Sequence, residues 1–115
     1  MKIARAGTTT RWSDTVTYQN TVYVVEVPQT LDADIETQSQ ELLTSLATLL
    51  DLAGSSKSHL LMATIYLADI RHIERFNAIW EAWLPSGTAP VRACIEAKLA
   101  NPGYKIEIQA IAATR

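Results

Sequence analysis

Three residues in the C-terminal part of the chain, Arg92, Cys94 and Glu107, have side chains that could together perform hydrolytic chemistry. Each lies in a segment that alternates between apolar and polar residues, which is typical of a β-strand. Asn101–Pro102–Gly103 lies between the two segments and predicts a hairpin turn, so that the three side chains would share one sheet face. A guanidinium can donate two parallel hydrogen bonds to a carboxylate, and a nearby carboxylate can position a water molecule or accept its proton. The pattern therefore indicates a hydrolytic site for a small carboxylic acid.

The same two segments also allow a simpler interpretation. Alternating charges on neighbouring strands often form a solvated face of ion pairs, which contributes little to stability. The spacing alone does not separate this interpretation from a site. The charged residues concerned are Arg92, Glu96, Lys98, Lys105 and Glu107.

Other residue types with catalytic potential are few. Cys94 is the single cysteine, and His59 and His72 lie in different predicted elements, without the pairing pattern of a thiol nucleophile. Their spacing is not that of a zinc site either, so no metal is expected. Trp80 and Trp83 are expected to be core or interface anchors, with stacking against RNA as the alternative.

Periodicity predicts the elements that would position these residues. Segments 15–18 and 21–27 are rich in β-branched and aromatic residues, and the two residues between them suit a tight hairpin turn. A helix is predicted over Asp32–Gly54: Asp32 and Asp34 suit its cap and first turn, its apolar residues share one face, and Gly54 ends it. Residues 59–68 alternate with both faces largely apolar, which predicts a central strand covered on both sides.

A second helix is predicted after Asp69, and its apolar stripe contains Asn77. A buried amide without hydrogen-bond partners costs about 1–3 kcal/mol, so Asn77 is either a structural bridge or part of a site. Strands 91–99 and 104–112 complete the chain, with Val91 and the residues that alternate with it directed toward the helices. The order ββ-α-β-α-ββ predicts one α+β domain over residues 1–115, with two helices on one face of a mixed or antiparallel sheet.

Composition limits the functional classes. The chain has 115 residues and a net charge of −2, and no run of Lys or Arg reaches three, so a nucleic-acid partner is not expected. One cysteine and the absence of a long apolar run predict a cytoplasmic protein without a membrane segment. Hydrophobic residues make up 48% of the chain and charged residues 19%, which predicts that self-association covers some apolar surface.

The C-terminal segments resemble the signature of the RidA (YjgF) reactive-intermediate deaminase family. That signature has a Pro-x-Arg-x-Cys segment and a later Lys-Ile-Glu-Ile-x-Ala-Ile-Ala strand, which match Ala89–Glu96 and Lys105–Ala112. Phe76–Trp83 resembles the second helix of the family, with Asn77 at its motif asparagine. The short length and the Arg11–Trp12–Ser13–Asp14 start are most similar to the YoaB-like branch.

This resemblance implies a chorismate-mutase-like fold, assembled as a homotrimer with ligand clefts between neighbouring subunits. It implies hydrolysis of enamines and imines, such as 2-aminoacrylate and its 2-imino tautomer, to 2-keto acids and ammonia, without a cofactor. Arg92 would bind the substrate carboxylate, and Glu107 would orient or activate the attacking water. Cys94 would line the pocket and Asn77 would support the site. Trp12 would take the place of the family's N-terminal pocket tyrosine.

The chain departs from the family pattern in its first third, where a Ser-Gly-Gln-x-Pro stretch is replaced by Val24–Pro28, with Glu26 near the glycine or glutamine. Two alternatives to the deaminase therefore stay open. One is a non-catalytic trimer that binds or senses small carboxylates, and the other is the ribonuclease or translation-inhibitor activity attributed to some relatives.

Overall fold

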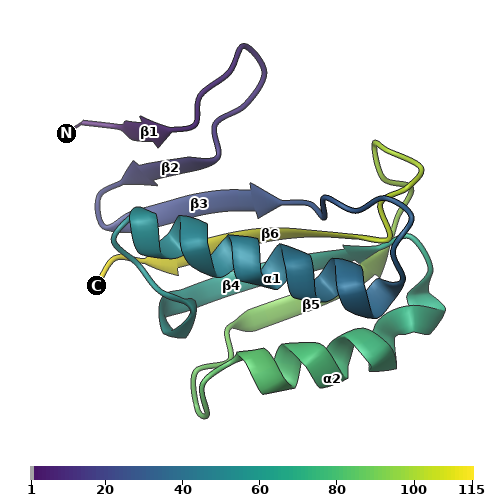
Figure 1. Cartoon of the computed structure of the whole chain (residues 1–115). Coiled ribbons are helices and arrows are strands. Elements are labelled where there is room, and N and C mark those ends of the chain that lie inside the picture. Colours follow the sequence, from purple (N-terminus) through teal and green to yellow (C-terminus); the bar gives the residue numbers. More distant parts are fainter. Residues whose placement is uncertain (1) are drawn as a thin grey trace.

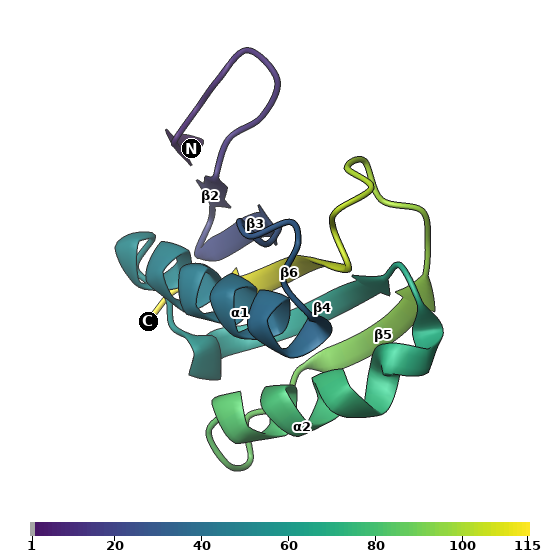
Figure 2. The ribbon, with the colours of Figure 1, turned by 45° about the vertical axis from the view of Figure 1, so that its right-hand side comes forward.

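A computed structural model describes residues 2–115 as a mixed six-stranded sheet with two α-helices on one of its faces (Figures 1 and 2). The strand order across the sheet is β1-β2-β3-β6-β4-β5. This confirms the predicted α+β class. The strands are β1 (Ala4–Ala6), β2 (Thr15–Tyr18), β3 (Thr21–Glu26), β4 (Leu60–Leu67), β5 (Val91–Glu96) and β6 (Ile106–Ala113), and the helices are α1 (Ile35–Leu52) and α2 (Ile73–Trp83).

The turn after β2 and the two ends of α1 have the local geometry that their residues favour. Gln19 and Asn20 both have positive φ, +52° and +67°, which is the geometry that a two-residue hairpin between twisted strands requires. Asp34 caps α1 by accepting a hydrogen bond from the backbone N–H of Thr37 at 2.8 Å. Gly54 follows α1 with φ +83°, a conformation that a glycine adopts without steric cost.

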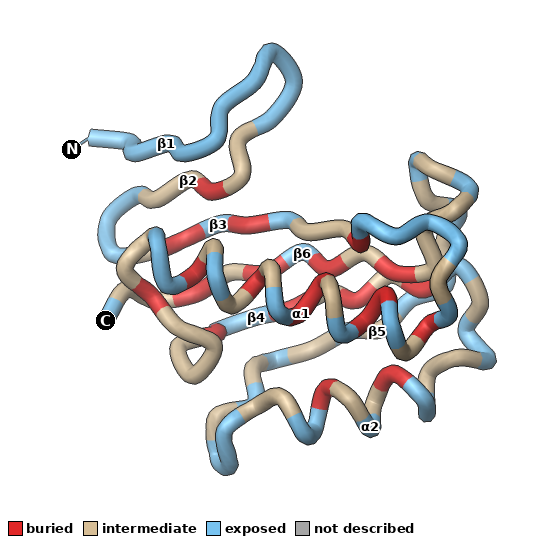
Figure 3. Tube along the Cα trace, viewed as in Figure 1, coloured by how far each residue is buried: buried red, intermediate tan, exposed pale blue. Residues whose placement is uncertain are grey.

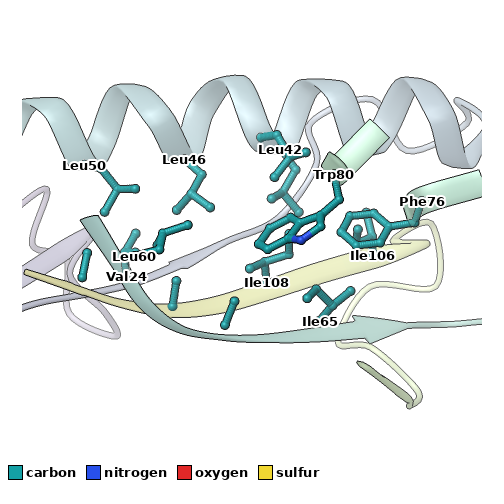
Figure 4. Packing of buried hydrophobic residues seen from close by; sticks show 14 of the residues in the cluster. Val24, Leu42, Leu46, Leu50, Leu60, Ile65, Phe76, Trp80, Ile106 and Ile108 are labelled. Atoms are coloured by element: carbon teal, nitrogen blue, oxygen red, sulfur yellow. The ribbon is translucent and has the colours of Figure 1, made fainter. Parts of the chain in front are cut away.

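The hydrophobic core lies between the sheet and the helices (Figures 3 and 4). The buried residues concentrate in β3, β4, β6 and the sheet-facing side of α1. Phe76 and Trp80 point from α2 toward Ile65, Ile106 and Ile108 of the sheet. Burial of apolar surface at about 25 cal/mol per Å² is the main force that fixes this face of the sheet against the helices.

The predicted hairpin of the last two strands is wrong. β6 lies between β3 and β4 and is antiparallel to both, whereas β5 pairs with β4 in parallel at the edge of the sheet. The connection from β4 to β5 contains α2, which gives the chain the length that a parallel crossover needs. Alternation and a turn sequence do not identify a strand's partner, because that depends on which apolar faces bury together.

The side chains of β5 also point to the sheet faces opposite to those predicted. Val91 and Ile95 are exposed, while Arg92 and Cys94 are half-buried on the side of the helices. In the same way β4 is covered on one face only, because Met62 on its other face is exposed. We call the side of the sheet away from the helices the open face. Its exposed large apolar residues are Tyr23, Val25, Met62, Val91 and Ile95.

Strand β1 was not predicted, and with β2 it forms an arm that stands away from the rest of the sheet (Figures 1 and 2). Residues 7–14 form the loop of this arm. Gly7 is required there, because its φ is +62° and a Cβ would overlap the carboxylate of Asp14. Thr9 accepts hydrogen bonds at Oγ1 from the backbone N–H groups of Arg11 and Trp12, which fixes the loop. Neither α1 nor α2, nor any other helix of residues 2–115, is both long and apolar enough to cross a membrane.

Candidate functional site

Arg92 is a residue of β5, and its guanidinium contacts two aromatic rings of α2. Its Cζ is 5.9 Å from the ring centroid of Phe76 and 5.9 Å from that of Trp80. Such cation–π contacts orient the guanidinium without using its N–H donors. Within residues 2–115 the Arg92 side chain makes no hydrogen bond and no ion pair, so these donors are free to bind a carboxylate.

Two further candidates accompany Arg92 on this side of the sheet. Cys94 projects to the same face two residues along β5 and packs against the core, and burial raises the pKa of its thiol. Asn77 follows Phe76 in α2, and its Oδ1 is buried without a hydrogen-bond partner among the described residues. We call Arg92, Cys94 and Asn77, with the rings of Phe76 and Trp80, the arginine half-site.

Glu107 lies on the open face, at a pocket of about 540 Å³. Its carboxylate forms no hydrogen bond and no ion pair with residues 2–115, so it too is free for a ligand. Trp12, 61% exposed on the loop of the arm, lines the same pocket. We call this pocket the glutamate half-site. Its lining residues are Trp12, Ser13, Asp14, Val25, Glu26, Val27, Ala100, Tyr104 and Glu107.

The carboxylate of Glu26 is engaged by its own surroundings. Ser45 of α1 donates a hydrogen bond to its Oε2 at 2.7 Å, and the backbone N–H of Val27 donates to its Oε1 at 3.0 Å. Glu26 therefore contributes to the rim of the glutamate half-site, while its carboxylate is held toward α1. It forms no ion pair with Arg92.

The structure does not bring the predicted site residues onto one face. Arg92 pairs with Ala63, which is buried under the helices, whereas Glu107 pairs with Tyr66, whose side chain lies on the open face. Arg92 and Cys94 thus face the side of the sheet on which α2 carries Asn77, and Trp12 and Glu107 line one pocket on the other side. The prediction of a shared face was wrong because it rested on a hairpin in which β5 and β6 are neighbours.

The alternative of a solvated ion-pair face is also wrong. The ion pairs among residues 2–115 are Arg71–Asp69, Arg75–Glu36 and Arg115–Asp51, none of which involves the charged residues of β5 and β6. Glu96 instead accepts a hydrogen bond from the backbone N–H of Ile70 at 3.0 Å. Lys105 donates to the carbonyl of Ala33 at 2.7 Å.

His59, Trp80 and Trp83 make contacts within the fold. Nδ1 of His59 is hydrogen-bonded to Ser56 at 2.7 Å, and Trp80 is a core residue with 4% exposure. Trp83 is half-buried, with the ammonium of Lys57 5.4 Å from its ring centroid. Within residues 2–115 no three His, Cys, Asp or Glu side chains gather in an arrangement that could hold a metal ion.

Sequence reasoning missed Tyr104 as a residue of the pocket. Tyr104 was predicted as the first residue of the last strand, but it lies in the loop before β6, half-buried at the glutamate half-site. The available signal was an aromatic residue directly after the Asn101–Gly103 turn. Such a residue at a loop end often lines a binding surface.

Comparison with known proteins identifies the family of the chain. A family model described as endoribonuclease L-PSP matches residues 2–114. The RutC family protein YoaB of Escherichia coli strain K12 is 44% identical over 113 residues, which cover 98% of this chain and 99% of that protein. This chain belongs to the endoribonuclease L-PSP family, also called RidA or YjgF.

Two further relatives place the chain within that family. A crystal structure of a YjgF family member from Neisseria meningitidis superposes with a TM-score of 0.96 at 35% identity, covering 100% of this chain and 97% of that one. A more distant relative, from Escherichia coli strain K12, is named 2-iminobutanoate/2-iminopropanoate deaminase. It is 30% identical over 92 residues, which cover 78% of this chain and 69% of that protein. The RidA/YjgF fold and the YoaB-like branch predicted from the sequence are therefore confirmed.

Proposed function

We propose that this RidA/YjgF family member is a homotrimer that hydrolyses 2-imino and enamine acids to 2-keto acids and ammonia. Each cleft would lie between two subunits, with the arginine half-site of one facing the glutamate half-site of the next. The observation that carries this proposal is that Arg92 and Glu107 form no hydrogen bond or ion pair within residues 2–115 and lie on opposite faces of one sheet. A small substrate that contacts both groups must therefore contact two copies of the chain.

The apolar open face supports self-association. Val91 is 68% exposed, Val25 49%, Ile95 46% and Tyr23 45%, although all four lie within regular strands. Several large exposed apolar residues on one sheet face are typical of a surface that another protein covers. A ring of three copies joined by one heterologous contact would cover them and would give every copy the same two half-sites.

The free groups have the chemistry that imine hydrolysis needs. The guanidinium of Arg92 would bind the substrate carboxylate through two parallel hydrogen bonds. Glu107 would accept a proton from water as the water oxygen bonds to the imine carbon and the C=N π-electrons move to nitrogen. Return of that proton to nitrogen gives the carbinolamine. Transfer of the carbinolamine hydroxyl proton to nitrogen, as the C–N bond breaks and the C=O bond forms, then releases ammonia and the 2-keto acid. One water is consumed and no redox change occurs.

A ribonuclease, which the family description names, is less well supported. Asp14, Glu26 and Glu107 all line the glutamate half-site, and carboxylates repel a polyphosphate backbone. A trimer that binds small carboxylates without turnover is the second candidate. It is consistent with the hydrogen bonds that occupy the carboxylate of Glu26 where the family pattern has small and polar residues.

The direct test is release of ammonia and 2-keto acid from 2-aminoacrylate that is generated in situ. The proposal expects hydrolysis faster than in buffer, and loss of this acceleration in Arg92→Ala. Hydrolysis at the buffer rate by folded trimer would overturn the deaminase. Titration with 2-oxobutanoate would then decide whether the protein binds carboxylates without catalysis.

A further inference from the structure

A buried glutamine of α1, Gln38, holds together two loops that border the glutamate half-site. Its side chain has 0% exposure. Its Nε2 donates toward three backbone carbonyls, those of Gly103 at 2.9 Å, Thr30 at 3.0 Å and Leu31 at 3.3 Å. Its Oε1 accepts a hydrogen bond from the backbone N–H of Lys105 at 2.8 Å. The amide thus connects the 27–34 loop to the 97–105 loop.

Other contacts near the Gln38 amide also hold the 27–34 loop against the 97–105 loop. A Cβ on Gly103 would lie 2.7 Å from the Cβ of Leu31, so the two loops approach each other more closely than any other residue type would permit. Nζ of Lys105 donates to the carbonyl of Ala33 at 2.7 Å, from one loop to the other. The backbone N–H of Gly103 also donates to Oδ1 of Asn101 at 2.8 Å, which fixes the turn internally.

Tyr104 lies between the two residues that Gln38 binds on this side. The carbonyl of Gly103 and the N–H of Lys105 belong to the two peptide units that flank Tyr104, so one side chain fixes the backbone on both sides of it. Tyr104 and Ala100 of this loop line the glutamate half-site together with Glu107, which is the second residue of β6. The position of this wall of the pocket is therefore determined from α1.

Core packing does not explain a glutamine at this position. The other buried residues of α1 are apolar except for Ser39, and they include Ile35, Leu42 and Leu43. A buried amide has to recover its lost hydration through hydrogen bonds, and an apolar side chain would have no such cost. All the hydrogen bonds of this amide go to the two loops, and none goes to another core side chain.

We propose that Gln38 is a positioning residue that sets the distance between Tyr104 and Glu107 and thereby the fit of substrate in the cleft. This inference rests on the proposed deaminase function. Gln38→Met fills a similar volume and removes all the hydrogen bonds of the amide. Gly103→Ala is a second variant, which leaves Gln38 in place but forces the loops apart. Leu50→Ala, in the core at the other end of α1, is the matched control for lost stability.

In the deaminase assay, Gln38→Met and Gly103→Ala should lower kcat/KM by about tenfold to a hundredfold, mainly through KM. Leu50→Ala should leave KM unchanged at a temperature where all three variants are folded. Equal KM values in Gln38→Met and the wild type would overturn the inference, because a purely structural role predicts that result.

A second measurement does not depend on turnover. The amide of Lys105 should exchange with solvent faster in Gln38→Met than in Leu50→Ala, and the NMR resonances of the Tyr104 ring should shift in Gln38→Met and Gly103→Ala. Unchanged Tyr104 resonances would overturn the positioning role even in an active enzyme. If the wild type has no deaminase activity but the Tyr104 resonances shift in the two variants, the positioning role is supported and only the proposed function is rejected.

Discussion

Arg92 pairs across the sheet with Ala63, and Glu107 pairs with Tyr66, so the two side chains that could bind and hydrolyse a carboxylic acid leave the sheet on opposite faces. The guanidinium is held under α2 by Phe76 and Trp80. The carboxylate lies at a pocket on the open face. The sheet itself separates them within one chain, which makes the relation between copies the central question for function.

Replacement of Arg92 should weaken substrate recognition more than it affects folding. A hydrogen bond to a charged group is worth about 1.5–3 kcal/mol, so Arg92→Ala should lower kcat/KM by at least about tenfold. Arg92→Lys should recover part of this loss, because an ammonium keeps the charge but not the planar pair of donors. The measurement is steady-state kinetics of ammonia release. Arg71→Ala, an exposed arginine on the segment before α2, is the control, and an equal loss there would contradict a specific carboxylate contact.

Two inactive variants should restore each other's activity if the cleft is shared between subunits. Glu107→Gln should lower kcat by about a hundredfold or more, as expected for removal of a general base. When Arg92→Ala and Glu107→Gln subunits are co-expressed in equal amounts, about a quarter of the clefts receive both native residues in a ring of heterologous contacts. The co-expressed protein should therefore show about a quarter of the wild-type rate per cleft. Activity no higher than that of either variant would contradict a shared cleft.

Asp69 should make the fold sensitive to acid. Side-chain hydrogen bonds from Arg71 and the backbone N–H of Arg71 lower the pKa of Asp69 from 3.8 to about 2. A carboxyl whose pKa is lowered in the folded state stabilises the protein above its unfolded pKa, and this stabilisation is lost as the pH falls toward the folded pKa. Urea unfolding between pH 4 and pH 2 should therefore show a smaller loss of stability in Asp69→Asn than in the wild type. An equal loss of stability in Asp69→Asn and in the wild type would contradict this contribution.

Cys94 should react slowly with electrophiles in the folded protein. Burial raises the pKa of its thiol, and the positive charge of Arg92 offsets this only in part. Alkylation requires the thiolate, so the rate with iodoacetamide should rise at higher pH in the folded protein than in protein unfolded by urea. Mass spectrometry of the alkylated fraction from pH 7 to pH 10 measures both profiles. Coincident pH profiles of the folded and unfolded protein would show that the fold does not raise the pKa of this thiol.

Much of the local structure could be predicted from the sequence. The segment 15–18 is β2 as predicted, one of the two predicted helix-start acids, Asp34, caps α1, and the apolar stripe of the second helix places Phe76 and Trp80 in the core. These features depend on residues within one or two turns of each other, such as a carboxylate that caps the next backbone N–H groups. The motifs of the last two strands and the second helix also identified the family.

The same motifs identified the candidate site residues but did not predict which face of the sheet each one occupies. Alternation along a strand establishes that Arg92 and Val91 face opposite ways, but it does not say which of them faces the helices. That choice was made by the core. Burial of Ile106 and Ile108 against the helices placed β6 between β3 and β4, and the crossover through α2 placed β5 parallel to β4 at the edge of the sheet.

The sequence by itself therefore determined both helices, the strands other than β1, the family and the chemistry of the individual groups. The tertiary structure alone decided that Arg92 and Glu107 are on opposite faces, and that Gln38 and Tyr104 belong to the surroundings of the pocket. The physical reason is that strand order and facing depend on apolar burial between segments distant in the sequence, whereas turns, caps and periodicity record only local interactions.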